Sequence, residues 1–300
     1  MIFGIYLKLC REKYNLTQEE LVHKCYNYHE DFEGLDVGTL SRWERGITNP
    51  SVDKQIKLTK ILRKYDNHIF PYINTYSRDE VEHELSVKSI NSLIGNSKEH
   101  ILKFPHSDLI TQNLKITNVK ETNNIETILK MPNDVLTTLL NNHYNLNIET
   151  LSSWVKHKNN LFLVSEYKDN FFGMIFVLRV KPTVFENLLS YKCDLASLSD
   201  SDFAQDSEIG CSFPVTFFAY NQTTAALLYL QYYANLIANQ DYISDVGITP
   251  ILDSSIKLAE KIGLVKYKTV KTDRGENSSY KASLEDVLLR EDVFKMLFKK

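Results

Sequence analysis

Apolar residues in the first quarter of the chain recur at the spacing of short amphipathic helices. Thr17 precedes the residues QEEL, and Glu20 completes a capping box with it, so a helix is expected to begin there. Leu21 gives this helix a buried side. Asp36 precedes a second helical segment, VGTLSRWERG, which ends at Gly46, a residue suited to a left-handed helix terminus. The pattern predicts two short helices separated by an interrupted turn.

Beyond these helices the apolar spacing changes from helical to mixed. Helices are expected at 52–63, 78–94, 124–129, 133–143, 148–156, 223–238, 251–262 and 284–298. Strands are expected at 114–120, 161–166, 172–180, 213–220, 242–247, 264–272 and 279–283. The fold class is therefore α+β overall, with an all-α head over 1–73, a helical linker over 74–107 and a mixed-sheet α/β body over 108–300.

The head resembles the lambda-repressor-like, or Xre-type, helix-turn-helix family over roughly residues 1–72. The residues that carry this resemblance are Leu9, Arg11, the segments LTQEEL (16–21) and LSRWERG (40–46), and Asn49-Pro50-Ser51. The resemblance implies that the later helix enters the major groove of double-stranded DNA. The expected DNA contacts are Gln18, Val37, Gly38, Thr39, Ser41, Arg42 and Arg45. A helical adaptor that uses the same fold for protein contact is the alternative.

One segment of the head departs from the family pattern. Relative to this family, residues 27–34 (NYHEDFEG) form an insertion between the second and third helices. The acids Glu30, Asp31 and Glu33 would be repelled by phosphate. We therefore expect this insertion to bulge away from DNA or to contact a protein partner.

The charge of the head bears on how it would bind DNA. Residues 1–73 contain 11 Lys and Arg against 10 Asp and Glu, and the whole chain carries a net charge of −3. Non-specific attraction to phosphate is weak at this balance. We therefore expect a homodimer, joined through the helix at 78–94 or the aromatic helix at 223–238.

The body resembles the GNAT acyltransferase fold over roughly 109–283. The resemblance is carried by the order of strands and helices, by 154–177 (WVKHKNNLFLVSEYKDNFFGMIFV) and by 253–269 (DSSIKLAEKIGLVKYKT). The resemblance implies that acyl-CoA pyrophosphate would lie where the fourth strand meets the next helix, because a helix N-terminus attracts anions.

Two departures from that family bear on catalysis. The motif that the resemblance implies is Arg or Gln, two residues, Gly, one residue, then Gly or Ala, and neither glycine is present here. Here Gln222 matches, but β-branched Thr223 and Thr224 would crowd the phosphate path, so these three residues are only weak cofactor-binding candidates. The family's general-acid tyrosine falls at or near Ala259. We therefore expect that the chain is not an enzyme, and we expect no cofactor.

Other chemistry has little support in the sequence. The four cysteines lack CxxC spacing, and His23 and His29 lack a convincing set of metal ligands, so no metal site is expected. No apolar run approaches the roughly 18 residues of a membrane span, and the N-terminus lacks the features of a signal peptide. A cytoplasmic location with no membrane partner is expected.

These observations predict a sequence-specific DNA-binding transcriptional regulator. The specific hypothesis is a dimeric repressor whose GNAT-like body dimerises or binds a small-molecule, peptide or protein signal. One alternative is an acetyl-CoA-dependent N-acyltransferase with a DNA-binding head. Another is a partner-binding, antitoxin-like regulator that uses the insertion as its contact surface.

Overall fold

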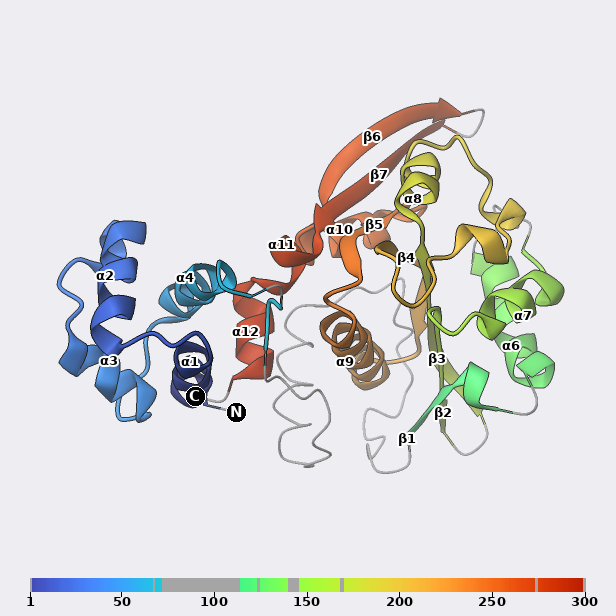
Figure 1. The fold of residues 1–300 in the computed structure, drawn as a ribbon. Coiled ribbons are helices and arrows are strands. Elements are labelled where there is room, and N and C mark those ends of the chain that lie inside the picture. The colour runs from blue at the N-terminus through green and yellow to red at the C-terminus, as the bar shows by residue number, and fades with distance from the viewer. Residues whose placement is uncertain are drawn as a thin grey trace. The chain divides into compact units, whose positions relative to one another are not determined.

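The computed structural model describes residues 2–66, 68–71, 114–122, 125–139, 146–167, 170–272 and 275–298. The chain divides into two compact units (Figure 1). One unit, the head, combines described residues of Met1–Ser89 with those of Leu288–Lys300, and the other, the body, lies within Ile90–Val287. The helix predicted at 78–94 and the linker predicted at 74–107 lie outside the described residues.

The helices of the head begin where the sequence places their caps. The head contains α1 (Phe3–Lys13), α2 (Gln18–Tyr28), a 3-10 turn (Glu30–Phe32), α3 (Val37–Glu44), α4 (Val52–Arg63) and α12 (Glu291–Leu297). Thr17 and Glu20 form the reciprocal capping box that was predicted for α2. Asp36 caps α3 by accepting a 2.6 Å hydrogen bond from the Thr39 amide. Gly46 then adopts a left-handed φ of 69°, which confirms the predicted end of this helix.

The C-terminal helix α12 completes the core of the head. Phe294 and Phe298 pack against Phe3, Tyr6 and Phe70, and we call these five residues the head aromatic cluster. The ring centroids of Phe298 lie 5.1 Å from those of both Phe3 and Tyr6, and Phe294 lies 5.5 Å from Phe70. The predicted body extended to residue 300, but the structure groups these last residues with the head. These residues belong with the head because their aromatic side chains are buried there, and the local sequence pattern does not predict such distant contacts.

The insertion at 27–34 folds back onto the head. Its Phe32 is buried in the head with 1% of its surface exposed. Asp31 forms an ion pair with Lys57 of α4, and Lys57 also pairs with Asp53 at 2.7 Å. Burial of Phe32 therefore holds this segment against the helices of the head. Its expected position away from DNA, or against a protein partner, remains a prediction.

The body is built on one mixed sheet. Within the described residues its strands are β1 (Leu114–Asn118), β2 (Leu161–Tyr167), β3 (Asn170–Val180), β4 (Gly210–Ala219), β5 (Ile243–Ile248), β6 (Val265–Thr272) and β7 (Gly275–Ser283). These seven strands lie in the order β1-β2-β3-β4-β5-β7-β6. Neighbours are antiparallel except β4 and β5, which are parallel. The prediction of an α+β chain with a mixed-sheet body is confirmed.

Helices cover both faces of this sheet (Figure 1). The body helices are α6 (Ile125–Leu139), α7 (Ile148–Lys156), α8 (Pro182–Leu189), α9 (Gln222–Ala238), α10 (Asp253–Lys261) and α11 (Leu284–Leu288). One helix, α6, runs through Pro132, where the sequence analysis placed a break. The predicted terminal helix is instead divided between α11 and α12.

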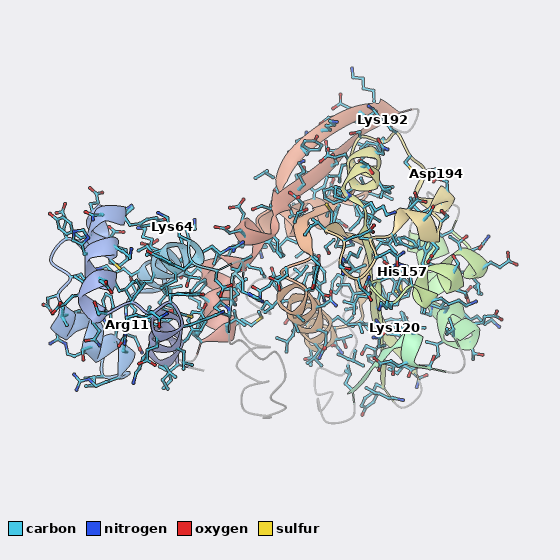
Figure 2. All side chains as sticks on the ribbon, in the orientation of Figure 1. Arg11, Lys64, Lys120, His157, Lys192 and Asp194 are labelled. Carbon is cyan, nitrogen blue, oxygen red and sulfur yellow. The ribbon has the colours of Figure 1, made fainter. Side chains whose placement is uncertain are left out.

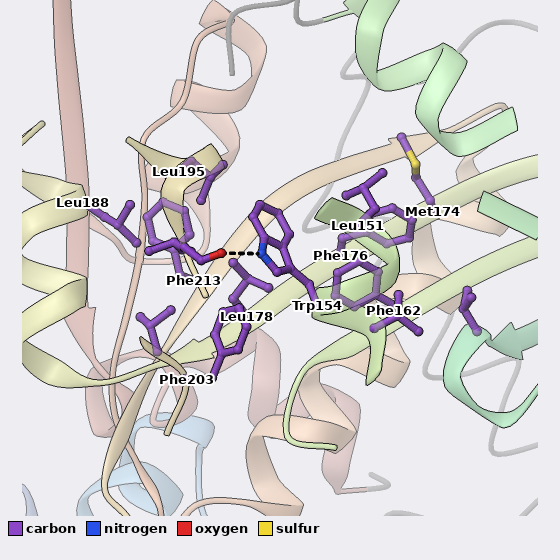
Figure 3. Close-up of a cluster of buried hydrophobic side chains, with 14 of the residues drawn as sticks. Leu151, Trp154, Phe162, Met174, Phe176, Leu178, Leu188, Leu195, Phe203 and Phe213 are labelled. Atoms are coloured by element: carbon purple, nitrogen blue, oxygen red, sulfur yellow. Dashed lines mark hydrogen bonds between the residues drawn. The ribbon is translucent and has the colours of Figure 1, made fainter. Parts of the chain in front are cut away.

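Alternation along β3 assigns the helices to opposite faces. Met174 and Phe176 belong to a buried cluster with Trp154 of α7 and Phe185 of α8. Figure 3 shows this cluster, including the 3.2 Å hydrogen bond from the Trp154 indole to the Leu198 carbonyl. Successive strand residues point to opposite faces. The intervening residue, Ile175, accordingly faces the side covered by α9 and α10.

Candidate functional site

The parallel strands β4 and β5 separate near the middle of the sheet. Their pairing runs from Gly210 with Ile243 to Ser212 with Val246 and extends no further within the described residues. Beyond that point β4 remains paired with β3, while β5 follows β7 as far as Ile248. As a result, the β4 residues 214–217 are only half-buried in a central strand.

A bulge in β4 accompanies this separation. Pro214 lies opposite Val177 and Thr216 lies opposite Phe176, so Val215 is the extra residue on β4. Proline cannot donate a backbone hydrogen bond, and a bulge bends and twists the strand that contains it. Pro214 is therefore a local sequence cause of the irregularity at this point.

The space between the two strands forms the β4–β5 cleft, with a volume of about 100 Å³. Its walls come from both strands, from α9 and α10 and from the loop after β5. The lining residues are Ile175, 214–217, Tyr229, Tyr232, 248–252, Ser255, Leu258, Ala259 and Ile262. None of these lining residues, all within the described part of the chain, carries a charge. The cleft is therefore suited to an apolar or neutral extended group.

Two tyrosines of α9 enter this cleft. The Tyr232 hydroxyl shares a 2.8 Å hydrogen bond with Ser212. The Tyr229 ring stands edge-on to Phe217, with 4.5 Å between centroids. Burial raises the pKa of both phenols above the usual value of 10. Both tyrosines therefore stay protonated at neutral pH.

The predicted phosphate-binding residues lie at the N-terminus of α9. Asn221 caps this helix, and its side-chain oxygen accepts a 2.8 Å hydrogen bond from the Thr224 amide. Gln222 is exposed and Thr223 is half-buried. Thr224 is fully buried against β3, where a Cβ added to Gly173 would lie 2.9 Å from its methyl carbon. Thr224 thus points into the sheet, and only Thr223 remains beside the predicted phosphate path.

The position where the resemblance places a general-acid tyrosine also lines the cleft. Ala259 is 1% exposed and contributes a methyl group to the α10 wall. A methyl group cannot donate a proton. Any proton donor in the cleft must therefore come from another residue.

In the head, Gln18 takes part in an internal network. Its side-chain amide donates a 2.8 Å hydrogen bond to Glu44, which is 4% exposed. Arg11 of α1 donates two further hydrogen bonds to the same carboxylate, of 2.6 and 3.0 Å, and this raises the pKa of Arg11 (Figure 2 labels its position). Gln18 therefore holds the end of α3 through Glu44, and its predicted contact with DNA remains a prediction.

The other predicted DNA contacts lie on α3 and just after it. Leu40 and Trp43 are buried. Gly38, Arg42 and Arg45 are exposed, whereas Val37, Thr39 and Ser41 are half-buried. The Arg42 guanidinium donates a 2.7 Å hydrogen bond to the Thr39 hydroxyl, and Arg45 donates to the Ser41 carbonyl at 3.2 Å. Contact of this surface with DNA remains a prediction.

Two parts of these sites were missed in the sequence analysis. The Arg11–Glu44 pair joins residues 33 positions apart, and no local pattern links them. The cleft depends on the point at which β4 and β5 separate, and only Pro214 hinted at it. In the described part of the chain, no three His, Cys, Asp or Glu side chains gather as metal ligands. Among the described helices, none is long and apolar enough to cross a membrane.

Similarity to known proteins is found only at the level of solved structures. No protein-family model matches the sequence, and curated proteins give no match. An aminoglycoside 6'-acetyltransferase type Ii is 11% identical, covers 57% of this chain and 97% of its own, and has a TM-score of 0.37. An N-acetyltransferase from Staphylococcus aureus Mu50 is 17% identical, covers 57% and 99%, and has a TM-score of 0.38. The aminoglycoside acetyltransferase AAC(6')-Ib in complex with coenzyme A is 12% identical, covers 57% and 94%, and has a TM-score of 0.33.

The body has a GNAT-like fold. The comparisons contradict the prediction that the chain is not an enzyme. The three matched structures named above are acetyltransferases, and one of them is in complex with coenzyme A. At these identities the likeness concerns the fold. The residues of the cleft must therefore carry any functional argument. No comparison matches the helix-turn-helix resemblance of the head.

Proposed function

We propose that the body binds acyl-CoA and transfers its acyl group to an amine. The observation that carries this proposal is the separation of β4 from β5, which opens an uncharged cleft beside an unpaired stretch of a central strand. The pantetheine arm of acyl-CoA is an extended chain with two amide groups. Strand edges hold such chains through backbone hydrogen bonds, while alternate pockets hold their apolar parts.

The elements around the cleft have complementary roles in this proposal. The half-buried residues 214–217 offer the backbone of β4 to the pantetheine amides. Apolar side chains from α10, such as Leu258 and Ile262, exclude water from the thioester. The N-terminus of α9 favours the negative pyrophosphate, which would replace the neutral Asn221 cap at the Thr224 amide.

Calorimetry with acetyl-CoA tests the binding step. We expect affinity in the micromolar range, on the order of −8 kcal/mol. Ser255→Trp fills the cleft from α10 and should weaken binding at least about tenfold. Lys257→Trp is the matched control, because Lys257 is exposed on the same helix and does not line the cleft. Absence of acetyl-CoA binding to the intact chain, or equal binding by both variants, would contradict the proposal.

A second candidate function is recognition of double-stranded DNA by the head. The observation in its favour is that the Arg11–Glu44–Gln18 network braces α3 while leaving Gly38 and Arg42 exposed. We expect Arg42→Ala to weaken specific binding by about 1–3 kcal/mol. Binding as a homodimer remains part of this candidate, but α9 is an unsuitable contact surface because most of its side chains are buried.

A mobility-shift series on the DNA that flanks the gene tests this candidate. Arg42→Ala is a cleaner probe than Gln18→Ala, because removal of Gln18 also takes a partner from buried Glu44. Lys8→Ala, an exposed change on α1, is the control for loss of one positive charge. Equal affinity of the Arg42 and Lys8 variants would exclude groove contact by α3.

A further inference from the structure

One end of the β4–β5 cleft is closed by strand pairing. β4 pairs with β5 as far as Ser212, and the Tyr232 hydroxyl of α9 shares a 2.8 Å hydrogen bond with the same residue. Further along β4, the Phe217 ring meets Tyr229, which precedes Tyr232 on α9. β4 and α9 therefore run in opposite directions along the cleft. A ligand whose anionic end lies at the N-terminus of α9 points its other end towards the closed end at Ser212.

The walls of the cleft offer two kinds of surface. Residues 214–217 of β4 are half-buried and, within the described residues, have no strand paired on the β5 side, so their backbone groups can bind amides. The helical walls present side chains alone, because the backbone groups of a helix are bonded to one another. These side chains include Leu258 and Ile262 of α10. Amides are therefore favoured along β4, and methylene groups along the helices.

The volume of the cleft exceeds what an acetyl group fills. An apolar cavity of about 150 Å³ can hold benzene, a ring of six carbons. By proportion, the volume of about 100 Å³ in this cleft corresponds to roughly four carbon atoms. A single acetyl methyl would leave most of this space without contacts, and unfilled apolar space forfeits dispersion energy. The cleft therefore fits a longer aliphatic chain better than a methyl group.

A small side chain interrupts the apolar α10 wall. Ala259 is 1% exposed and contributes only a methyl group to the cleft, whereas Leu258 and Ile262 beside it are large. The resemblance to acyltransferases places a tyrosine at or near this position, and alanine leaves the volume of that ring to a ligand. Ala259 also lies one turn after Ser255, and so about 6 Å further along α10 from the loop that follows β5. The vacated space is therefore distant from that loop.

We propose that the acyl-CoA bound by the body carries an aliphatic acyl chain of about four to six carbons, and that Ala259 limits its length. This inference rests on the proposed binding of acyl-CoA. The pyrophosphate lies at the N-terminus of α9, the pantetheine amides follow β4, and the acyl chain packs against Leu258, Ala259 and Ile262. The hydrogen bond between Ser212 and Tyr232 closes the space beyond the chain.

Calorimetry with the full chain and a series of CoA esters tests this inference. Each buried methylene should tighten binding about fourfold, so butyryl-CoA should bind about 15-fold more tightly than acetyl-CoA. The gain should end near hexanoyl-CoA, and octanoyl-CoA should bind no more tightly, because its additional methylene groups have no apolar wall to meet. Free CoA is the reference without an acyl group.

Variants of α10 test whether the chain lies within the cleft. Ala259→Leu should leave the affinity for acetyl-CoA within about threefold of the wild type but remove the advantage of butyryl-CoA, because the added carbons occupy the space of the chain. Leu258→Ala enlarges the same wall and should extend the gain to octanoyl-CoA. Lys257→Leu is the matched control, because Lys257 is exposed on the same helix and does not line the cleft. Thermal unfolding checks that each variant is folded.

The outcomes separate this inference from the proposed function. Acetyl-CoA that binds as tightly as butyryl-CoA and hexanoyl-CoA would overturn the acyl-chain site and leave acyl-CoA binding in place. A gain that continues through octanoyl-CoA in the wild type, or that persists in a folded Ala259→Leu variant, would place the chain outside the cleft and overturn the inference as well. If Ala259→Leu does not fold, the wild-type series and Leu258→Ala decide. Absence of binding by every ester would contradict the proposed function itself, and the acyl-chain site with it.

Discussion

The C-terminal helix α12 should determine the stability of the head. Phe294 is 1% exposed, and its ring lies 5.5 Å from Phe70, 5.5 Å from Phe298 and 6.3 Å from Phe3. Phe294→Ala removes an aromatic ring from a packed core and leaves a cavity. Such changes cost about 3–5 kcal/mol in free energy of unfolding. We therefore expect the urea midpoint of the head to fall by at least about 1 M.

The two tryptophans of the chain allow the head to be followed separately. Trp43 lies in the head and Trp154 in the body, so a Trp154→Phe background leaves Trp43 fluorescence as a report on the head. Lys295→Ala is the matched control on the same helix, because the Lys295 side chain is 49% exposed. A head whose urea midpoint is the same in the Phe294 and Lys295 variants would refute the assignment of α12 to its core.

Three further predictions concern other groups. Glu44→Ala removes the carboxylate that accepts two hydrogen bonds from the Arg11 guanidinium. It should destabilise the head by about 3 kcal/mol, measured by urea unfolding. A loss below about 1 kcal/mol would contradict a structural role for the Arg11–Glu44–Gln18 network. Burial lowers the pKa of His157 below 6.5, so the folded body binds fewer protons than the unfolded chain. Its free energy of unfolding should therefore decrease as pH falls through about 6.5, and His157→Gln should reduce that dependence in unfolding followed by Trp154 fluorescence. Cys193 is half-buried, whereas burial raises the pKa values of the other three thiols to about 11 or 12. Mass spectrometry after brief alkylation should therefore find Cys193 modified first. Equal labelling of all four cysteines would refute this expectation.

Local signals identified most of the helices and strands. The capping box of Thr17 and Glu20, the Asp36 cap and the left-handed Gly46 are each determined by neighbouring residues, and all are present in the structure. The boundaries of α4 agree with the predicted 52–63 for the same reason. Apolar runs likewise located β2 and β3, which pair as antiparallel neighbours.

Predictions that depended on distant contacts were less complete. The insertion was judged from its acids, but burial of Phe32 decides its position. Thr224 was placed in the phosphate path, but close packing against Gly173 turns it into the sheet. The missing tyrosine at Ala259 was read as loss of catalysis, but only the structure shows that Ala259 lines the cleft.

The sequence by itself determined the helix caps, the order of strands and helices and the α+β class, because these depend on residues a few positions apart. Only the tertiary structure decided that α12 belongs with the head, because its aromatic residues meet partners almost the full chain length away. It also decided where the cleft lies. The pairing of β4 with β5 ends at Ser212, beyond which β4 stays paired with β3 and β5 stays paired with β7. The spacing of neighbouring residues carries no information about contacts between distant parts of the chain, and burial and strand pairing depend on those contacts.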